Sequence, residues 1–207
     1  LRHPNIIAVI DFFTVETELC YVMEYVPGPN WADEIEEPVN RKLVLPMSAE
    51  QALLRVKGLL PAFKYLHALN PPIIYCDFKP SNVKSMTLSN GDQIEVLLDF
   101  GTAYRYDPNV PPNPARGTPG YHSMQASHPD WRDDYFTIGR TIAELVGMAE
   151  VHTEQYRYTL TPPDQFPWTQ YDVSLRYLVE WLTAPERENR PQNVDAILAE
   201  IEGVLGY

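Results

Sequence analysis

Two acid-bearing segments on either side of a predicted β-hairpin constrain the fold of this chain more than any other feature. Residues 75–82 read YCDFKPSN and include Asp77, and residues 97–101 read LLDFG and include Asp99. Between them, two apolar runs flank an Asn-Gly pair at positions 90–91, a pair that favours a tight hairpin turn. Because a hairpin returns the chain to the point where it left, we expect the two carboxylates to lie close together.

The residues beside these acids are those that phosphoryl transfer requires. Lys79 and Asn82 follow Asp77 in the same loop, so an ammonium and an amide should meet the carboxylates of Asp77 and Asp99 in one small volume. Phosphoryl transfer uses an acid that orients the acceptor hydroxyl, oxygen ligands for Mg²⁺ and a cation near the transferred group. Taken alone, Asp77 and Asn82 could equally be loop caps, so the chemical interpretation depends on the whole ordered set.

The composition is that of a globular domain and narrows the classes of partner. The chain has 207 residues, 44% hydrophobic and 21% charged, which suits one domain of ordinary size. The formal net charge is −12 with no cluster of Lys or Arg, so neither nucleic acid nor an anionic membrane is expected as a partner. Cys20 and Cys76 are too few for a disulfide framework or a zinc cluster, and they fit a reducing, cytoplasmic compartment. The chain contains no apolar run of membrane-spanning length, and its start at Leu1, inside a folded pattern, suggests a fragment.

The first half of the chain predicts a hairpin followed by a long helix. Two apolar runs within residues 6–26 are separated by a short polar segment and predict a β-hairpin. Residues 29–47 are polar and interrupted by proline, and are interpreted as a connection. A capping-box signal at Ser48 predicts a helix over 49–68, with a kink at Pro61 because proline removes one helical hydrogen bond.

The second half predicts a long loop and three helices. Residues 101–120 show no regular period, whereas 134–147, 172–183 and 192–204 show helical patterns, the first of them apolar enough to lie centrally. His67 is interpreted as a structural residue. The expected fold class is therefore α+β, mainly α.

The motifs resemble those of the protein kinase family, whose catalytic loop and Asp-Phe-Gly motif correspond to residues 75–82 and 99–101. This resemblance covers the whole chain in order, and it implies the end of the N-terminal lobe and the hinge at 1–26, with a two-stranded remnant hairpin, and the C-terminal lobe at 27–207. The other segments that show it are Leu1–Ile6, Val22–Val26, Gly117–Tyr121, Asp134–Gly139 and Asn189–Pro191. Within the family, the chain looks most similar to bacterial kinases of the mycobacterial protein kinase G type.

The resemblance implies roles for the residues at the phosphate end of the site. Asp77 would be the general base that orients the acceptor hydroxyl, and Lys79 would contact the γ-phosphate and favour Ser/Thr acceptors in a protein substrate. Thr118 would steady both side chains. Asn82 and Asp99 would bind Mg²⁺.

The resemblance also implies roles for the residues that would contact the adenine base of ATP. Met23 would be the gatekeeper, and the Glu24 carbonyl and the Val26 amide would reach the adenine edge. Lys84 stands where an apolar side chain usually packs under adenine, so either its aliphatic stem does the packing or nucleotide binding is weakened.

Two departures from the family pattern bear on regulation. Cys76 replaces an Arg that normally pairs with a phosphate on the activation segment, and no Ser or Thr occurs between positions 103 and 116. We therefore expect an enzyme that is not switched on by phosphorylation in that stretch. Gln125 replaces a Glu that normally pairs with the Arg at position 190, and it cannot neutralise that guanidinium.

The sequence given contains no glycine-rich phosphate loop, no strand-borne Lys and no helix C Glu of the kind that the family has at the front of its domain. We expect these 207 residues alone to be inactive, because unprotected phosphates stay hydrated and poorly positioned. Three functions remain open: an ATP- and Mg²⁺-dependent protein serine/threonine kinase, a pseudokinase binding module, and a small-molecule phosphotransferase of the aminoglycoside kinase type. Lys79 and the segment 117–121 favour the first.

Overall fold

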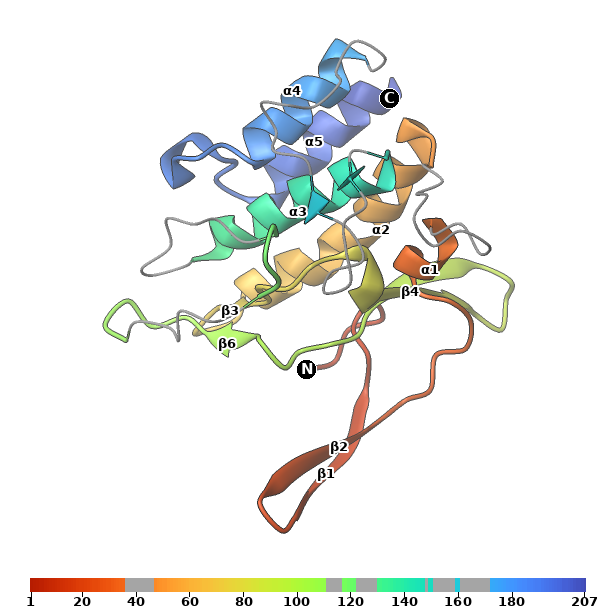
Figure 1. The fold of residues 1–207 in the computed structure, drawn as a ribbon, viewed down its shortest axis with the longest axis vertical. Helices are drawn as coiled ribbons and strands as arrows, with labels where there is room; N and C mark the ends of the chain where they lie inside the picture. Colours follow the sequence, from red (N-terminus) through yellow and green to blue (C-terminus); the bar gives the residue numbers. More distant parts are fainter. Residues whose placement is uncertain (36–46, 111–116, 122–129, 148, 151–158, 161–171) are drawn as a thin grey trace.

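A computed structural model describes residues 1–35, 47–110, 117–121, 130–147, 149–150, 159–160 and 172–207 of the chain. Figure 1 shows a body of helices, with a small β-ribbon at one end and a two-stranded hairpin that projects from it. The helices α2 to α5 pack on one another, and their apolar faces form the main core. This mixture of helices and small antiparallel sheets agrees with the expected α+β class, while its division into lobes stays a prediction.

The projecting hairpin consists of β1 (Val9–Val15) and β2 (Glu18–Met23), as the sequence predicted. Every residue of β1 is exposed. The hairpin is attached at its base, where the amide of Ile7 donates to the Leu97 carbonyl at 2.9 Å and the amide of Leu97 donates to the Asn5 carbonyl at 2.9 Å. Most of the hairpin surface therefore contacts none of the described residues.

A short helix, α1 (Trp31–Ile35), follows the hairpin and corrects part of the expectation that 29–47 is only a connection. Asn30 and Asp33 exchange side-chain to backbone hydrogen bonds, so they form a reciprocal cap at its start. Trp31 and Ile35 are fully buried against the ribbon and α2. Residues 36–46 lie outside the described part of the chain.

The long helix α2 (Ala49–His67) has the predicted capping box, because the Ser48 hydroxyl accepts from the Gln51 amide and the Gln51 side chain accepts from the Ser48 amide. Pro61 lies within the helix, which continues to His67. The kink at Pro61 stays a prediction. The buried face of this helix lies at the centre of the core.

The predicted second hairpin is the ribbon of β4 (Val83–Thr87) and β5 (Gln93–Leu97), which pair in an unbroken antiparallel register. A single 3-10 turn, η1 (Pro80–Asn82), leads into it. One face of the ribbon meets α1, where the Glu95 carboxylate accepts from Trp31 Nε1 at 2.9 Å and from the Ser85 hydroxyl at 2.6 Å.

Part of the segment predicted to be an irregular loop is a strand. β6 (Tyr104–Arg105) pairs antiparallel with β3 (Ile73–Ile74), which precedes the catalytic-loop sequence. A two-residue strand is too short to give a periodic signal, so the sequence did not reveal it. The pairing fixes the start of the 101–120 segment beside residues 73–76.

The central helix α3 (Trp131–Leu145) begins three residues before the position predicted from its apolar pattern. Asp130 caps it, and Asp133 returns a bond to the Asp130 amide. The remaining elements are β7 (Ala149–Glu150), β8 (Thr159–Leu160), α4 (Val173–Leu182), η4 (Arg187–Asn189) and α5 (Val194–Leu205). The helices α4 and α5 agree with their predicted ranges to within two residues.

Cys20 and Cys76 are both free, and Cys76 is buried while Cys20 is half-buried. Among the residues that the structure describes, none of the helices has the length and apolar character needed to span a bilayer.

Candidate active site

A buried carboxylate on α3 accepts hydrogen bonds from the backbone of the loop that holds Asp77. Asp134 is fully buried, and its two oxygens accept hydrogen bonds from the amides of Tyr75 at 3.0 Å and Cys76 at 2.8 Å. His67 Nε2 lies 2.8 Å from the same carboxylate, which can only accept, so this nitrogen carries the hydrogen. These bonds hold Cys76 in the left-handed region at φ 69°, a strained conformation for a residue with a side chain.

The Asp77 carboxylate is the centre of the site and contacts three of the predicted residues. One oxygen accepts from the Thr118 hydroxyl at 2.6 Å, and the other accepts from Lys79 Nζ at 2.9 Å and from Asn82 Nδ2 at 3.0 Å. Asn82 Nδ2 also donates to the Asp77 carbonyl at 2.9 Å. Asp77 is therefore held in one orientation by groups from two segments of the chain.

Residues 117–121 are bound to this loop and to α3. Lys79 Nζ donates to the Thr118 hydroxyl, which itself donates to Asp77. Arg140 Nε donates to the Gly120 carbonyl at 2.9 Å, and the Thr141 hydroxyl donates to the Phe78 carbonyl at 3.1 Å. The helix α3 thus positions both the catalytic-loop sequence and the segment that contains Thr118.

The second predicted acid, Asp99, follows directly from the ribbon. The Leu98 amide donates to the Asn82 carbonyl at 3.0 Å, so Asp99 leaves the ribbon next to Asn82. Burial raises the pKa of Tyr75 well above its ordinary value of 10.0, and the negative charges of Asp77 and Asp99 raise it further. Both carboxylates thus raise the pKa of the same buried phenol, while the role of Asp99 as a metal ligand stays a prediction.

The oxygens of Asn82 and Asp99 suit a hard cation. In the described part of the chain, the Asn82 side chain donates to Asp77 through Nδ2, so Oδ1 would be its ligand atom for a metal. Asp99 accepts from the Gly101 amide at 2.8 Å through Oδ1. The described residues contain no group of three His, Cys, Asp or Glu side chains that could hold a metal alone. This donor set fits Mg²⁺, which commonly takes one or two protein ligands and completes its shell with phosphate and water.

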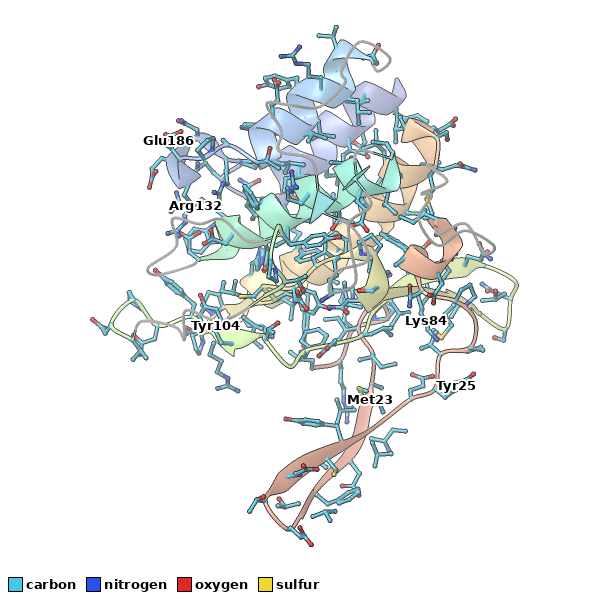
Figure 2. All side chains as sticks on the ribbon, in the orientation of Figure 1. Met23, Tyr25, Lys84, Tyr104, Arg132 and Glu186 are labelled. Carbon is cyan, nitrogen blue, oxygen red and sulfur yellow. The ribbon has the colours of Figure 1, made fainter. Side chains whose placement is uncertain are left out.

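The residues predicted to contact a base lie where the hairpin joins the body. Met23 ends β2, and the Glu24 amide donates to the Ala8 carbonyl at 2.9 Å across the hairpin. Val26 is buried, and Lys84 Nζ donates to its carbonyl at 3.1 Å. Figure 2 places Lys84 on the body, beside the segment that contains Tyr25. The backbone of residues 24–26 and the side chain of Lys84 are thus brought together.

Comparison with known proteins decides the family. A family model described as "Protein kinase domain" matches residues 1–199. The chain belongs to the protein kinase family.

Individual relatives are also protein kinases. The chain is 33% identical to myosin light chain kinase A of Dictyostelium discoideum, over 67% of the chain and 45% of the relative. It is 28% identical to a serine/threonine-protein kinase of Arabidopsis thaliana, over 70% of the chain and 29% of the relative. It is 26% identical to the serine/threonine-protein kinase pkn3 of Myxococcus xanthus, over 99% of the chain and 40% of the relative. The chain spans less than half the length of these relatives.

Arg190 has a carboxylate partner that the sequence did not reveal. The Arg190 guanidinium is buried and donates to Asp133 at 3.0 Å and to the Ala184 carbonyl at 2.8 Å. Arg187 also pairs with Asp133 at 3.1 Å. The charge of Arg190 is therefore neutralised by a residue of α3, and replacement of Glu by Gln125 does not leave it without a carboxylate. Gln125 itself lies outside the described residues.

A buried acid near Thr118 was not anticipated. Glu144 is fully buried in α3 and accepts a hydrogen bond from the Tyr121 hydroxyl. Burial raises the pKa of Glu144 well above its ordinary value, and the positive charge of Lys79 acts in the opposite direction. An isolated Glu in an apolar helix was the signal in the sequence that could have identified it.

The surroundings of Cys76 bear on the predicted absence of a phosphorylation switch. Tyr104 pairs with Ile74 in the β3–β6 sheet, two residues before Cys76. Burial raises the pKa of the Tyr104 phenol, and neighbouring Cys76 raises it further. Tyr106 packs edge-on against Trp131, with ring centres 6.2 Å apart. Residues 111–116 lie outside the described part, and the regulatory expectation stays a prediction.

Proposed function

We propose that this domain transfers the γ-phosphoryl group of ATP, with Mg²⁺, to the hydroxyl of a Ser or Thr in a protein substrate. The single observation that supports this most strongly is the hydrogen-bonded group of Asp77, Lys79, Asn82 and Thr118. A general base must be held close to the proton that it takes. Asp77 meets this need because both of its oxygens are oriented by partners.

Three of these side chains, those of Asp77, Lys79 and Thr118, have separate roles in the proposed reaction. Asp77 orients the acceptor hydroxyl and takes its proton as the phosphoryl group is transferred. Lys79, half-buried and already paired with Asp77, supplies positive charge for the transferred group. Thr118 links the two and fixes the segment 117–121 beside them, where a protein substrate would dock.

Asn82 and Asp99 would hold the metal, and residues 23–26 with Lys84 would hold the base. A bound Mg²⁺ would neutralise charge on the phosphates. The Glu24 carbonyl and the Val26 amide offer one acceptor and one donor to a base edge, with Met23 as gatekeeper. The free cysteines accord with a cytoplasmic location, which we include in the proposal.

The contact between Thr118 and Asp77 favours a protein kinase over a small-molecule phosphotransferase, because it joins the predicted protein-docking segment to the catalytic acid. A pseudokinase is the second candidate, and the charged Lys84 at the base site favours it. We expect residues 1–207 alone to be inactive, and ordinary turnover by this chain would contradict that expectation.

The proposal is tested by ATP-dependent phosphorylation of a protein substrate by the full-length protein. Asp77→Asn should lower the rate by about 10²–10⁴-fold, and Asp99→Ala should abolish binding of Mg²⁺-ATP. Asp92→Asn, at the exposed ribbon turn, is the matched control and should leave both unchanged. Binding of Mg²⁺-ATP without transfer by the unaltered protein would identify a pseudokinase, and equal rates for Asp77→Asn and the unaltered protein would refute the proposed base.

A further inference from the structure

The ribbon of β4 and β5 has one face towards the main core and a second apolar face turned away from it. Lys84 lies on the second face. Lys84 pairs with Val96 and Met86 pairs with Ile94, so these four side chains share the face turned away from the main core. Val96 is buried and packs in a small apolar cluster with Val26. Lys84 is thus the charged member of a face that is otherwise apolar.

The ammonium of Lys84 reaches the segment between the hairpin and α1. Lys84 Nζ lies 3.1 Å from the Val26 carbonyl, and β4 also forms an isolated bridge between Lys84 and Asn30. Residues 24–29, here called the linker, connect β2 to α1. Among the hydrogen bonds between described residues, the bond from Lys84 is the one that reaches residues 25–29.

The other arm of the hairpin is attached differently. Asn5 and Ile7 exchange backbone hydrogen bonds with Leu97 of β5, and Asn5 Nδ2 donates to the Glu95 carbonyl at 2.8 Å. One arm is therefore held by backbone bonds to β5. In the linker, the side chain of Lys84 bonds to Val26, while the Glu24–Ala8 bond and the bridge at Asn30 hold the two ends. The linker also contains Gly28 at φ 89° and Tyr25 with 82% of its surface exposed, and its apolar contact is the packing of Val26 in the cluster with Ile7 and Val96.

We propose that Lys84 is a positioning residue that holds the linker against the ribbon and so presents the backbone of residues 24–26 to the nucleotide base. This inference rests on the proposed function. The bond uses the Val26 carbonyl, whereas the base would use the Glu24 carbonyl and the Val26 amide, so the tether and the base do not compete. The aliphatic stem of Lys84, lying along the apolar face, would form part of the floor of the base site.

The test compares Lys84→Met, which keeps an unbranched stem but removes the donor, with Lys84→Arg, which restores a donor. Hydrogen exchange of the amides of Tyr25, Val26 and Gly28 should be faster in Lys84→Met and should return towards the original rate in Lys84→Arg. The Kd for Mg²⁺-ATP of the full-length protein should rise about tenfold in Lys84→Met, since a hydrogen bond to a charged group has a strength of that order.

The control variant is Lys57→Met, which removes an ammonium of similar exposure that pairs with Glu202 on α5 at 3.0 Å. It should alter neither linker exchange nor nucleotide affinity. Unchanged linker exchange in Lys84→Met would overturn the tether, and equal or tighter nucleotide binding would overturn its role in presenting the backbone. If the unaltered protein binds no nucleotide, the proposed function fails together with the nucleotide part of the inference, while linker exchange still decides whether Lys84 holds the linker.

Discussion

Replacement of Asp134 should destabilise the protein far more than its position outside the proposed reaction suggests. Asp134→Ala removes the acceptor of the buried amides of Tyr75 and Cys76 and the partner of His67. Each buried donor left without a partner costs about 1–3 kcal/mol, so the two amides alone give roughly 2–6 kcal/mol. The total free energy of unfolding of a domain is about 5–15 kcal/mol, so this loss is a large fraction of it.

Asp134→Asn should cost less, about 1–3 kcal/mol, because the amide oxygen still accepts from one amide while the amino group faces the other. The measurement is urea unfolding followed by tryptophan fluorescence, with the slope compared between variants to check that the unfolded states are alike. Asp195→Ala is the control, since Asp195 pairs with Lys64 on the surface and its loss should cost no more than about 1 kcal/mol. A loss for Asp134→Ala as small as that of Asp195→Ala would refute the view that this carboxylate supports the loop.

Two further predictions concern α3. Gly139→Ala would place a Cβ 2.7 Å from the side chains of Leu182 and Thr183, so it should destabilise the protein by about 1–3 kcal/mol in the same unfolding measurement. The control is Gly203→Ala in α5, whose Cβ would meet no atom within 4 Å and which should be neutral or stabilising. Equal effects of the two substitutions would contradict the close packing at Gly139. Burial raises the pKa of Glu144 above its ordinary value of 4.5, so its contribution to stability is fully present below that pH and is lost as the pH rises through the higher folded-state value. The stability of Glu144→Gln relative to the unaltered protein should therefore increase as the pH rises from about 5 to about 8. A stability difference that does not change with pH would contradict a raised pKa for Glu144.

Local signals in the sequence predicted most of the elements. Ser48 and Gln51 define the start of α2 because a capping box involves only neighbouring residues, and the Asn-Gly pair at 90–91 defines the ribbon turn for the same reason. The ribbon in turn allowed the approach of Asp99 to the loop of Asp77 to be expected. The second hairpin, and the return of its end to Asn82 in the loop of Asp77, could thus be predicted from the sequence.

The parts that sequence reasoning missed depend on contacts between distant residues or on less familiar caps. Helix α3 starts at Trp131 because Asp130 and Asp133 cap one another, a pair of acids that the usual Ser/Thr and Glu/Gln pattern does not include. The pairing of Arg190 with Asp133 joins residues 57 positions apart, and no local pattern marks it. The bond of Lys84 to Val26, 58 positions apart, belongs to the same class.

The left-handed backbone at Cys76 limits how this loop can be reused in protein design. For a residue other than glycine, that conformation is unfavourable by roughly 1–2 kcal/mol, and here its amide is held by a carboxylate on a helix distant in the sequence. A graft of residues 75–82 onto another scaffold would relax to a different shape unless an equivalent of Asp134 were built beneath it. The smallest transferable unit is therefore the loop together with the first turns of α3.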